Sequence, residues 1–167
     1  EREWELAREF LAQHSRFLLD DGSHLIRLAH DTDRCPGVLD ALVGAAEETT
    51  SGLRPLRSFD LRIPVLASND ARSKTLFDNA YGTGQSCWTT ILDLIDPRGV
   101  GAPVAGMRVV VIGYGDVGRG CARFGAALGA RVTVVELDPV RALQASMDGF
   151  AVASLEEAAL SAGMLIS

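Results

Sequence analysis

Lysine is almost absent from this sequence: of its 16 basic residues only Lys74 is lysine, and the others are arginine. The net charge is −6 and no basic run occurs, which argues against a nucleic-acid surface because nothing would neutralise the phosphates. No apolar run approaches the roughly 20 residues that cross a bilayer, and nothing near Glu1 resembles a signal peptide. The sequence therefore predicts a protein without a nucleic-acid or membrane partner.

Cysteine is also scarce, with only Cys35, Cys87 and Cys121 and no CxxC spacing. This odd and scattered set predicts reduced thiols in a cytoplasmic protein and offers no metal site. The remaining composition, 47% hydrophobic and 23% charged, is typical of an ordinary globular chain. A length of 167 residues allows one good core or parts of two domains.

The most strongly patterned stretch lies in the C-terminal half. An apolar run, 109–112, is followed by the glycine-rich sequence 113–118, a small-residue helical segment to Leu128 and a β-branched run, 132–135. This order predicts strand, tight turn, helix and strand, the first half of a Rossmann-type dinucleotide-binding unit. A glycine-rich turn that merely packs tightly is the simpler alternative, but it leaves Glu136 at the tip of the second strand unexplained.

Each glycine of the turn has a predicted purpose. Gly113 lets the chain turn sharply, Gly115 lets the backbone approach a pyrophosphate, and Gly118 lets the helix pack close to the strand. Glu136 follows Gly118 by eighteen residues, close to the spacing of a carboxylate that binds both ribose hydroxyls. A 2′-phosphate would meet this carboxylate as a like charge, so the motif predicts NAD rather than NADP.

Strand and helix patterns also alternate ahead of the glycine turn. We predict an α/β fold in which part of an α/β substrate-binding domain (1–81) and a connecting helix and hinge (82–99) precede the N-terminal half of a Rossmann NAD-binding domain (100–167). Because the chain stops inside an apolar run and lacks a second cofactor-binding half, we expect a fragment. The expected elements are helices over 1–13, 23–30, 73–94 (interrupted by Gly82 and Gly84), 140–147 and 155–161, a buried strand over 17–19, and short strands over 63–67, 150–152 and 164–166.

Four polar clusters lie ahead of the glycine turn, and several of their groups gather near strand tips, where open α/β sheets bind ligands. They are Asp20-Asp21, Glu47-Glu48-Thr49-Thr50, Asn69-Asp70, and Lys74 with Asp78-Asn79. Lys74 and Asp78 are four apart and would share a helix face. A solvated ion pair is the simpler interpretation, and codon bias alone can leave one lysine. Yet a lysine held by a carboxylate can take the proton of an alcohol during hydride transfer, as arginine cannot.

Several blocks of the sequence closely resemble the S-adenosylhomocysteine hydrolase family. The blocks are Leu19–Gly22, Glu47–Gly52, Ser68–Asp70, Ser73-Lys74 with Phe77–Ser86, Gly113–Gly120, and Glu136–Pro139 with Ala142–Ala145. They follow one another in the family's order over nearly the whole chain. The resemblance implies NAD-dependent hydrolysis of S-adenosyl-L-homocysteine to adenosine and homocysteine, by transient oxidation of the ribose at C3′, elimination of homocysteine, addition of water and reduction.

The resemblance also assigns roles to individual residues. Lys74 and Asp78 would lie at the 3′-hydroxyl, with Lys74 as the proton acceptor, Glu48 would hold the ribose hydroxyls, and Asp21 would transfer protons near C4′ and C5′. Asn69 and Asn79 would orient the lysine and the cofactor. The implied cofactor contacts are Thr49, Thr50, Ser51, Asn79, Gly113, Gly115, Asp116, Val117, Gly118, Arg119, Gly120, Glu136 and Arg141.

Two positions depart from the family pattern. His24 stands in a segment that often continues Gly-Asp, and we expect a solvent-facing histidine at a helix start. Arg141 stands where some members carry asparagine near the cofactor ribose, which faintly reopens NADP against Glu136. Family members form homotetramers, and their N-terminal histidine motif, second cofactor half and C-terminal substrate segments have no counterpart here, so we expect the fragment alone to be inactive.

Other interpretations remain open. One is a relative that acts on another nucleoside thioether, and another is a non-catalytic, NAD-binding regulatory homologue. The second is disfavoured because a binding module has no need for all four of Lys74, Asp78, Glu48 and Asp21. A 2-hydroxyacid dehydrogenase shares the glycine turn but leaves the block over 69–86 unexplained.

Overall fold

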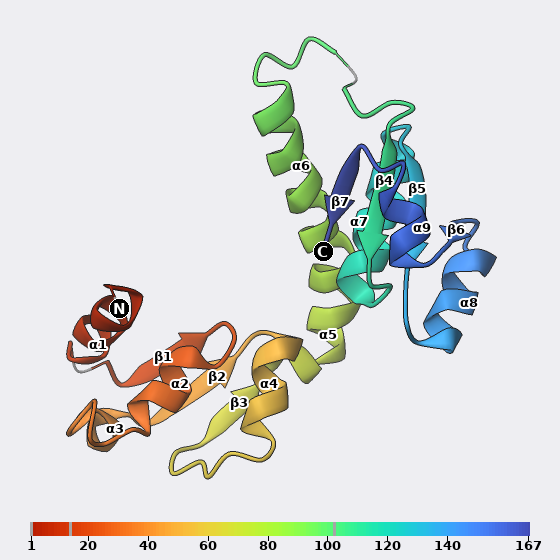
Figure 1. Ribbon diagram of the computed structural model, residues 1–167. Coiled ribbons are helices and arrows are strands. Elements are labelled where there is room, and N and C mark those ends of the chain that lie inside the picture. Colours follow the sequence, from red (N-terminus) through yellow and green to blue (C-terminus); the bar gives the residue numbers. More distant parts are fainter. Residues whose placement is uncertain (1, 14, 102) are drawn as a thin grey trace. The chain divides into compact units, whose positions relative to one another are not determined.

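The chain folds as two units, Glu1–Lys74 and Thr75–Ser167, in a computed structural model that describes residues 2–13, 15–101 and 103–167. Each unit has its own parallel sheet with helices, so the predicted α/β class is confirmed (Figure 1). The boundary falls after Lys74, seven residues ahead of the expected end of the first part, and the segment 82–99 belongs to the second unit. The functional names given to those parts stay predictions.

The N-terminal unit is built on a three-stranded parallel sheet in the order β1-β2-β3. Pro64 directly precedes the edge strand β3, as its missing N–H requires. The strands are β1 (Phe17–Asp20), β2 (Gly44–Glu47) and β3 (Val65–Ala67), and the helices are α1 (Arg2–Leu11), α2 (His24–Ala29), α3 (Val38–Ala41), α4 (Thr50–Leu56), the 3₁₀ helix η1 (Ser68–Asp70) and α5 (Arg72–Lys74).

Strand β1 corrects one expectation, because it is buried on one face only. Leu18 and Asp20 point inward, whereas Phe17 and Leu19 are each 69% exposed. Side chains alternate across a strand, so a continuous apolar run need not be buried on both faces. Strand β2 was not predicted, since its residues Gly44, Ala45 and Ala46 lack the bulky β-branched side chains that mark strands.

The C-terminal unit has a four-stranded parallel sheet in the order β6-β5-β4-β7, the arrangement of the first Rossmann half. No helix within the described ranges is both long and apolar enough to cross a bilayer. The strands are β4 (Arg108–Ile112), β5 (Arg131–Val135), β6 (Ala151–Val152) and β7 (Met164–Ile166), and the helices are the π-helix η2 (Thr75–Gly82), α6 (Thr83–Ile95), α7 (Asp116–Ala127), α8 (Pro139–Met147) and α9 (Leu155–Ala159).

Close contact between α6 and α7 depends on glycine. A Cβ on Gly84 would lie 2.7 Å from the Gly120 carbonyl carbon, and one on Gly125 would lie 2.6 Å from the Trp88 ring. Trp88 is 1% exposed and donates its indole N–H to the Cys121 carbonyl at 2.8 Å. Gly84 was expected to interrupt the helical segment, but α6 continues through it. The missing side chain instead leaves room for the backbone of Gly120.

Candidate functional site

Lys74 ends the N-terminal unit, and its ammonium binds oxygen atoms of Glu48 and Asn69. Its Nζ donates to the Glu48 carbonyl at 2.9 Å and to Asn69 Oδ1 at 3.2 Å, and it lies 3.9 Å from Glu48 Oε1. The lysine side chain is only 21% exposed, whereas that of Glu48 is 45% exposed. The lysine is therefore fixed in one position beside a carboxylate that solvent and ligands can reach.

Asn69 connects Lys74 to the loop after β2. Its side chain is buried, and its Nδ2 donates to Thr50 Oγ1 at 2.8 Å while its Oδ1 accepts from the lysine. Just ahead of it, Ser68 Oγ donates to the Glu47 carbonyl at 2.8 Å. The structure thus brings Lys74, Asn69, Glu48 and Thr50 together.

Thr49 caps the start of helix α4. Its Oγ1 accepts from the Gly52 N–H at 3.0 Å and lies 3.2 Å from Ser51 Oγ. Thr49 also donates its backbone N–H and its hydroxyl to Glu47 Oε1, at 2.8 and 2.7 Å. The predicted cofactor contacts Thr49, Thr50 and Ser51 therefore share one capped helix start.

Asp21 is exposed on the loop after β1, directly beyond two buried acids. Asp20 and Glu47 are paired across β1 and β2 and are 4% and 0% exposed. Burial raises the pKa of Asp20, and the neighbouring Glu47 carboxylate raises it further. The sequence put Glu47 in a polar cluster but gave it no role. Its inward position opposite Asp20 follows from strand β2, which the sequence did not predict. His24 is exposed at the start of α2, as expected.

In the C-terminal unit, the glycine turn has the predicted geometry. Gly113 has φ +94°, a conformation that favours glycine, and a Cβ on Gly118 would overlap the Gly113 carbonyl oxygen. Gly115 precedes α7, and the nearest atom to a Cβ placed there is Arg141 Nη1 at 3.5 Å. Gly118 therefore has no room for a side chain, because the backbone of Gly113 lies against it. Arg141 is the side chain nearest to Gly115.

Glu136 is held as an ionised acceptor beside this turn. Its Oε2 accepts from the Tyr114 N–H at 2.6 Å, and its Oε1 accepts from the Leu137 and Asp138 N–H groups at 2.7 and 2.9 Å. These backbone donors, with a smaller contribution from the Arg141 charge, lower the pKa of Glu136. A carboxylate of this kind accepts only, so it suits hydroxyl groups and repels a phosphate.

Other residues of the turn are engaged in packing. Arg119 pairs with Asp116 at 3.1 Å within α7, and a Cβ on Gly120 would lie 2.5 Å from the Ala80 carbonyl oxygen. The side chain of Tyr114 is buried, and its hydroxyl donates to Asp148 at 2.8 Å. Burial and this hydrogen bond both raise the pKa of Tyr114.

Asp78 and Asn79 lie on the π-helix η2, in the C-terminal unit. Asp78 is exposed, while Asn79 is 6% exposed. Extra-wide helical turns of this kind often occur at functional sites. Because Lys74 belongs to the other unit, the shared helix face of Lys74 and Asp78 stays a prediction.

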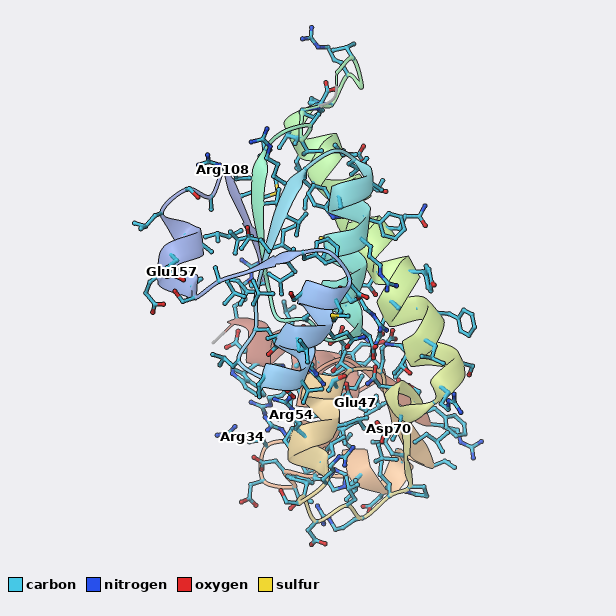
Figure 2. The ribbon with its side chains drawn as sticks, turned by 90° about the vertical axis from the view of Figure 1, so that its right-hand side faces the viewer. Arg34, Glu47, Arg54, Asp70, Arg108 and Glu157 are labelled. Carbon is cyan, nitrogen blue, oxygen red and sulfur yellow. The ribbon has the colours of Figure 1, made fainter. Side chains whose placement is uncertain are left out.

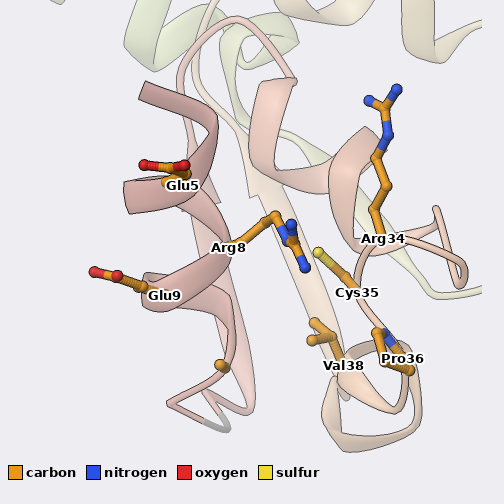
Figure 3. A pocket seen from close by; sticks show the side chains of 8 residues that line it. Glu5, Arg8, Glu9, Arg34, Cys35, Pro36 and Val38 are labelled. Atoms are coloured by element: carbon orange, nitrogen blue, oxygen red, sulfur yellow. The ribbon is translucent and has the colours of Figure 1, made fainter. Parts of the chain in front are cut away.

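The N-terminal unit also has a hollow of about 460 Å³ between α1 and the segment before α3 (Figure 3). Arg8 points across it toward Cys35, and the predicted site residues do not line it. Its lining residues are Glu5, Arg8, Glu9, Ala12, Arg34, Cys35, Pro36 and Val38. Two arginines and two glutamates balance in charge, so this hollow favours no ligand of either sign.

The glycine turn and Glu136 fit the adenosine half of a dinucleotide. A side chain at Gly115 would extend toward the Arg141 guanidinium, and the first N–H groups of α7 have no partner within the helix. Glu136 offers its remaining lone pairs to a diol. Arg141 adds a positive charge beside Gly115.

A family model described as "S-adenosyl-L-homocysteine hydrolase, NAD binding domain" matches residues 79–167. An adenosylhomocysteinase of Thermotoga maritima is 47% identical over 161 residues, which cover 94% of this chain and 38% of that protein. An S-inosyl-L-homocysteine hydrolase of Methanothermobacter thermautotrophicus is 44% identical over 171 residues, covering all of this chain and 39% of that protein. The chain thus spans less than half the length of these relatives.

Solved structures show the same fold at low identity. A phosphoglycerate oxidoreductase from Vibrio cholerae matches with a TM-score of 0.58 and 15% identity, over 98% of this chain and 54% of that one. A dipicolinate synthase chain from Bacillus halodurans matches with a TM-score of 0.56 and 18% identity, over 77% of this chain and 44% of that one. At this identity both likenesses concern the fold alone.

Proposed function

Because the chain belongs to the S-adenosyl-L-homocysteine hydrolase family, we propose that its protein hydrolyses S-adenosyl-L-homocysteine to adenosine and homocysteine with NAD as cofactor. The observation that carries this proposal is Lys74, the sole lysine of the chain, held by Asn69 and by Glu48 at the carboxyl ends of the sheet. The activity is proposed for the whole protein, since the relatives are much longer.

The residues of the N-terminal unit supply groups that bind the ribose and move protons. Lys74 takes the proton of the 3′-hydroxyl in its neutral amine form. A lysine amine can release and regain a proton, whereas a guanidinium stays protonated. Glu48 accepts the ribose hydroxyls with its exposed carboxylate. Asp21, also exposed, exchanges protons near C4′ and C5′.

Residues of each unit carry proposed NAD contacts. When bound, NAD accepts a hydride from the ribose and later returns it. Glu136 holds the adenosine ribose, the turn from Gly113 to Gly120 and Arg141 face the phosphates, and Asn79 orients the cofactor. Thr49, Thr50 and Ser51 are the contacts from the N-terminal unit.

The nucleobase of the substrate is a choice between two purines. Relatives of nearly equal identity are named adenosylhomocysteinase and S-inosyl-L-homocysteine hydrolase. We favour the adenosyl substrate and take the inosyl thioether as the alternative. A homotetramer in the cytoplasm, working in the S-adenosylmethionine cycle of one-carbon metabolism, completes the proposal.

The test measures homocysteine release with a thiol reagent from both thioethers, using the full native protein. We expect release from S-adenosyl-L-homocysteine, and we expect Lys74→Arg to abolish release and reduction of the nicotinamide while NAD stays bound. Arg108→Lys, the reverse exchange at an exposed position of β4, is the control and should leave activity unchanged. Release by Lys74→Arg contradicts the assignment, and bound NAD without release by the unaltered protein supports a non-catalytic homologue.

A further inference from the structure

The buried side chain of Glu47 accepts four hydrogen bonds, although the proposed chemistry gives it no role. It is 0% exposed at the end of β2 (Figure 2). Its Oε1 accepts from the Gly22 N–H at 3.0 Å and from the Thr49 N–H and hydroxyl, and its Oε2 accepts from the Ser23 N–H at 2.8 Å. One side chain thus joins the loops after β1 and β2.

These bonds orient the loop that carries Asp21. The Asp21 N–H donates to the buried Asp20 Oδ1 at 3.0 Å, and the next two N–H groups donate to Glu47. Three successive backbone amides therefore point toward buried carboxylates, which leaves the Asp21 side chain on the exposed side. Ser23 is held at φ 61°, a conformation that a residue other than glycine keeps only when its surroundings enforce it.

The same carboxylate orients the loop that carries Glu48. Thr49 is bound to Glu47 by both its N–H and its hydroxyl, so Glu48 is fixed between two anchored neighbours. Gly52 packs so closely that a Cβ there would overlap the Glu47 carboxylate. No water or substrate reaches a group this enclosed, so Glu47 acts through its neighbours.

We propose that Glu47 is a positioning residue that sets the relative placement of Asp21 and Glu48. This inference rests on the proposed function for the roles of those two side chains. The placement requires two acceptor oxygens, because donors converge on each. Glutamine in the same position offers one acceptor and turns an NH₂ group toward the donors on the other side.

The test replaces Glu47 by glutamine and compares it with Glu157→Gln. Glu157 accepts two hydrogen bonds from Ser154 at the start of α9, so the control makes the same exchange at an exposed carboxylate of the C-terminal unit. Displacement of a reacting group costs about a hundredfold in rate, so we expect kcat of Glu47→Gln to fall about tenfold to a hundredfold with KM within about twofold. We expect Glu157→Gln to retain the kcat of the unaltered protein.

Amide hydrogen exchange supplies a readout that needs no activity. We expect the Ser23 amide, and with it that of Gly22, to lose protection in Glu47→Gln but not in Glu157→Gln. Unchanged protection, or an unchanged kcat where the unaltered enzyme is active, overturns the inference. A protein that never releases homocysteine refutes the proposed function, and exchange then still decides whether Glu47 holds the loops.

A second variant serves if Glu47→Gln does not fold. Thr49→Val removes the hydroxyl that accepts from the Gly22 N–H at 3.1 Å and donates to Glu47, whereas Thr49→Ser keeps it. We expect the Gly22 amide to exchange faster in the valine variant alone. Equal exchange in the two variants overturns the inference.

Discussion

Replacing Gly120 by alanine distinguishes packing from cofactor binding at the end of the glycine turn. The new Cβ would lie 2.5 Å from the Ala80 carbonyl oxygen, 3.1 Å from its carbon and 3.5 Å from the Asn79 carbonyl oxygen. All three atoms belong to the backbone of η2, so no side-chain rotation relieves the overlap. Helix α7 and η2 must move apart by several tenths of an ångström.

Two free-energy terms of opposite sign set the size of the effect. Overpacking costs about 1–3 kcal/mol. The overlap at Gly120 is with backbone atoms, so we take the upper part of that range, about 2–3 kcal/mol, and alanine in a helix interior recovers about 1 kcal/mol relative to glycine. We therefore expect Gly120→Ala to lower the free energy of unfolding by about 1–2 kcal/mol. For a domain of roughly 100 residues this lowers Tm by about 4–16 °C.

The assay combines urea unfolding with an NAD-binding titration. Gly101→Ala is the matched control, because its Cβ would meet only Asp96 Oδ2 at 3.7 Å, an ordinary contact. We expect the control to stay within about 0.5 kcal/mol of the unaltered protein. Unchanged stability of Gly120→Ala together with weakened NAD binding would refute the packing argument and give Gly120 a direct cofactor contact.

Three further predictions concern single sites. Ser23→Gly should raise the free energy of unfolding by about 1 kcal/mol in urea titrations, because it removes the left-handed strain at φ 61°; a loss of stability would contradict this. With a thiol reagent the folded protein should label quickly at Cys87 alone, since Cys35 is buried and burial raises the pKa of buried Cys121 to about 12; rapid labelling of all three would contradict it. Backbone hydrogen bonds lower the pKa of Glu136 below its ordinary value of 4.5 in the folded state. The NMR shifts of the N–H groups that it binds should therefore change only below pH 4.5, when the carboxylate takes up its proton. A transition at or above pH 4.5 would exclude these hydrogen bonds.

The C-terminal unit could be predicted closely because its signals are local. The glycine turn and Pro139, which stands at the first position of α8, mark element boundaries within a few residues. Strand β2 could not be predicted this way, because Gly44, Ala45 and Ala46 form a strand only through pairing with β1 and β3. The wide turn of η2 likewise has no signal of its own.

The candidate site could be predicted most readily where residue type carries the information. Lys74 was singled out by rarity, and the structure holds it with Asn69 and Glu48. Gly120 was assigned to the cofactor from its place in the motif, which stays a prediction, and the structure gives it a second reason to be glycine, its packing against the backbone of η2. Sequence spacing cannot distinguish these reasons for a glycine, since both need a missing side chain.

Each unit has an acid at the end of one strand that binds a backbone amide in the loop after the neighbouring strand. Sequence analysis gave a role to one of these acids, Glu136, and none to the other, Glu47. In each unit, neighbouring parallel strands bring their carboxyl ends to one edge, so an acid after the second strand reaches amides in the loop after the first. Glu136 after β5 binds the Tyr114 N–H after β4, and Glu47 at the end of β2 binds the Gly22 N–H after β1. Gly22 and Gly113, at φ +86° and +94°, make the turns that aim these amides. Glu136 remains partly exposed and can bind a ligand, whereas Glu47 is wholly enclosed and can only hold the loops around it.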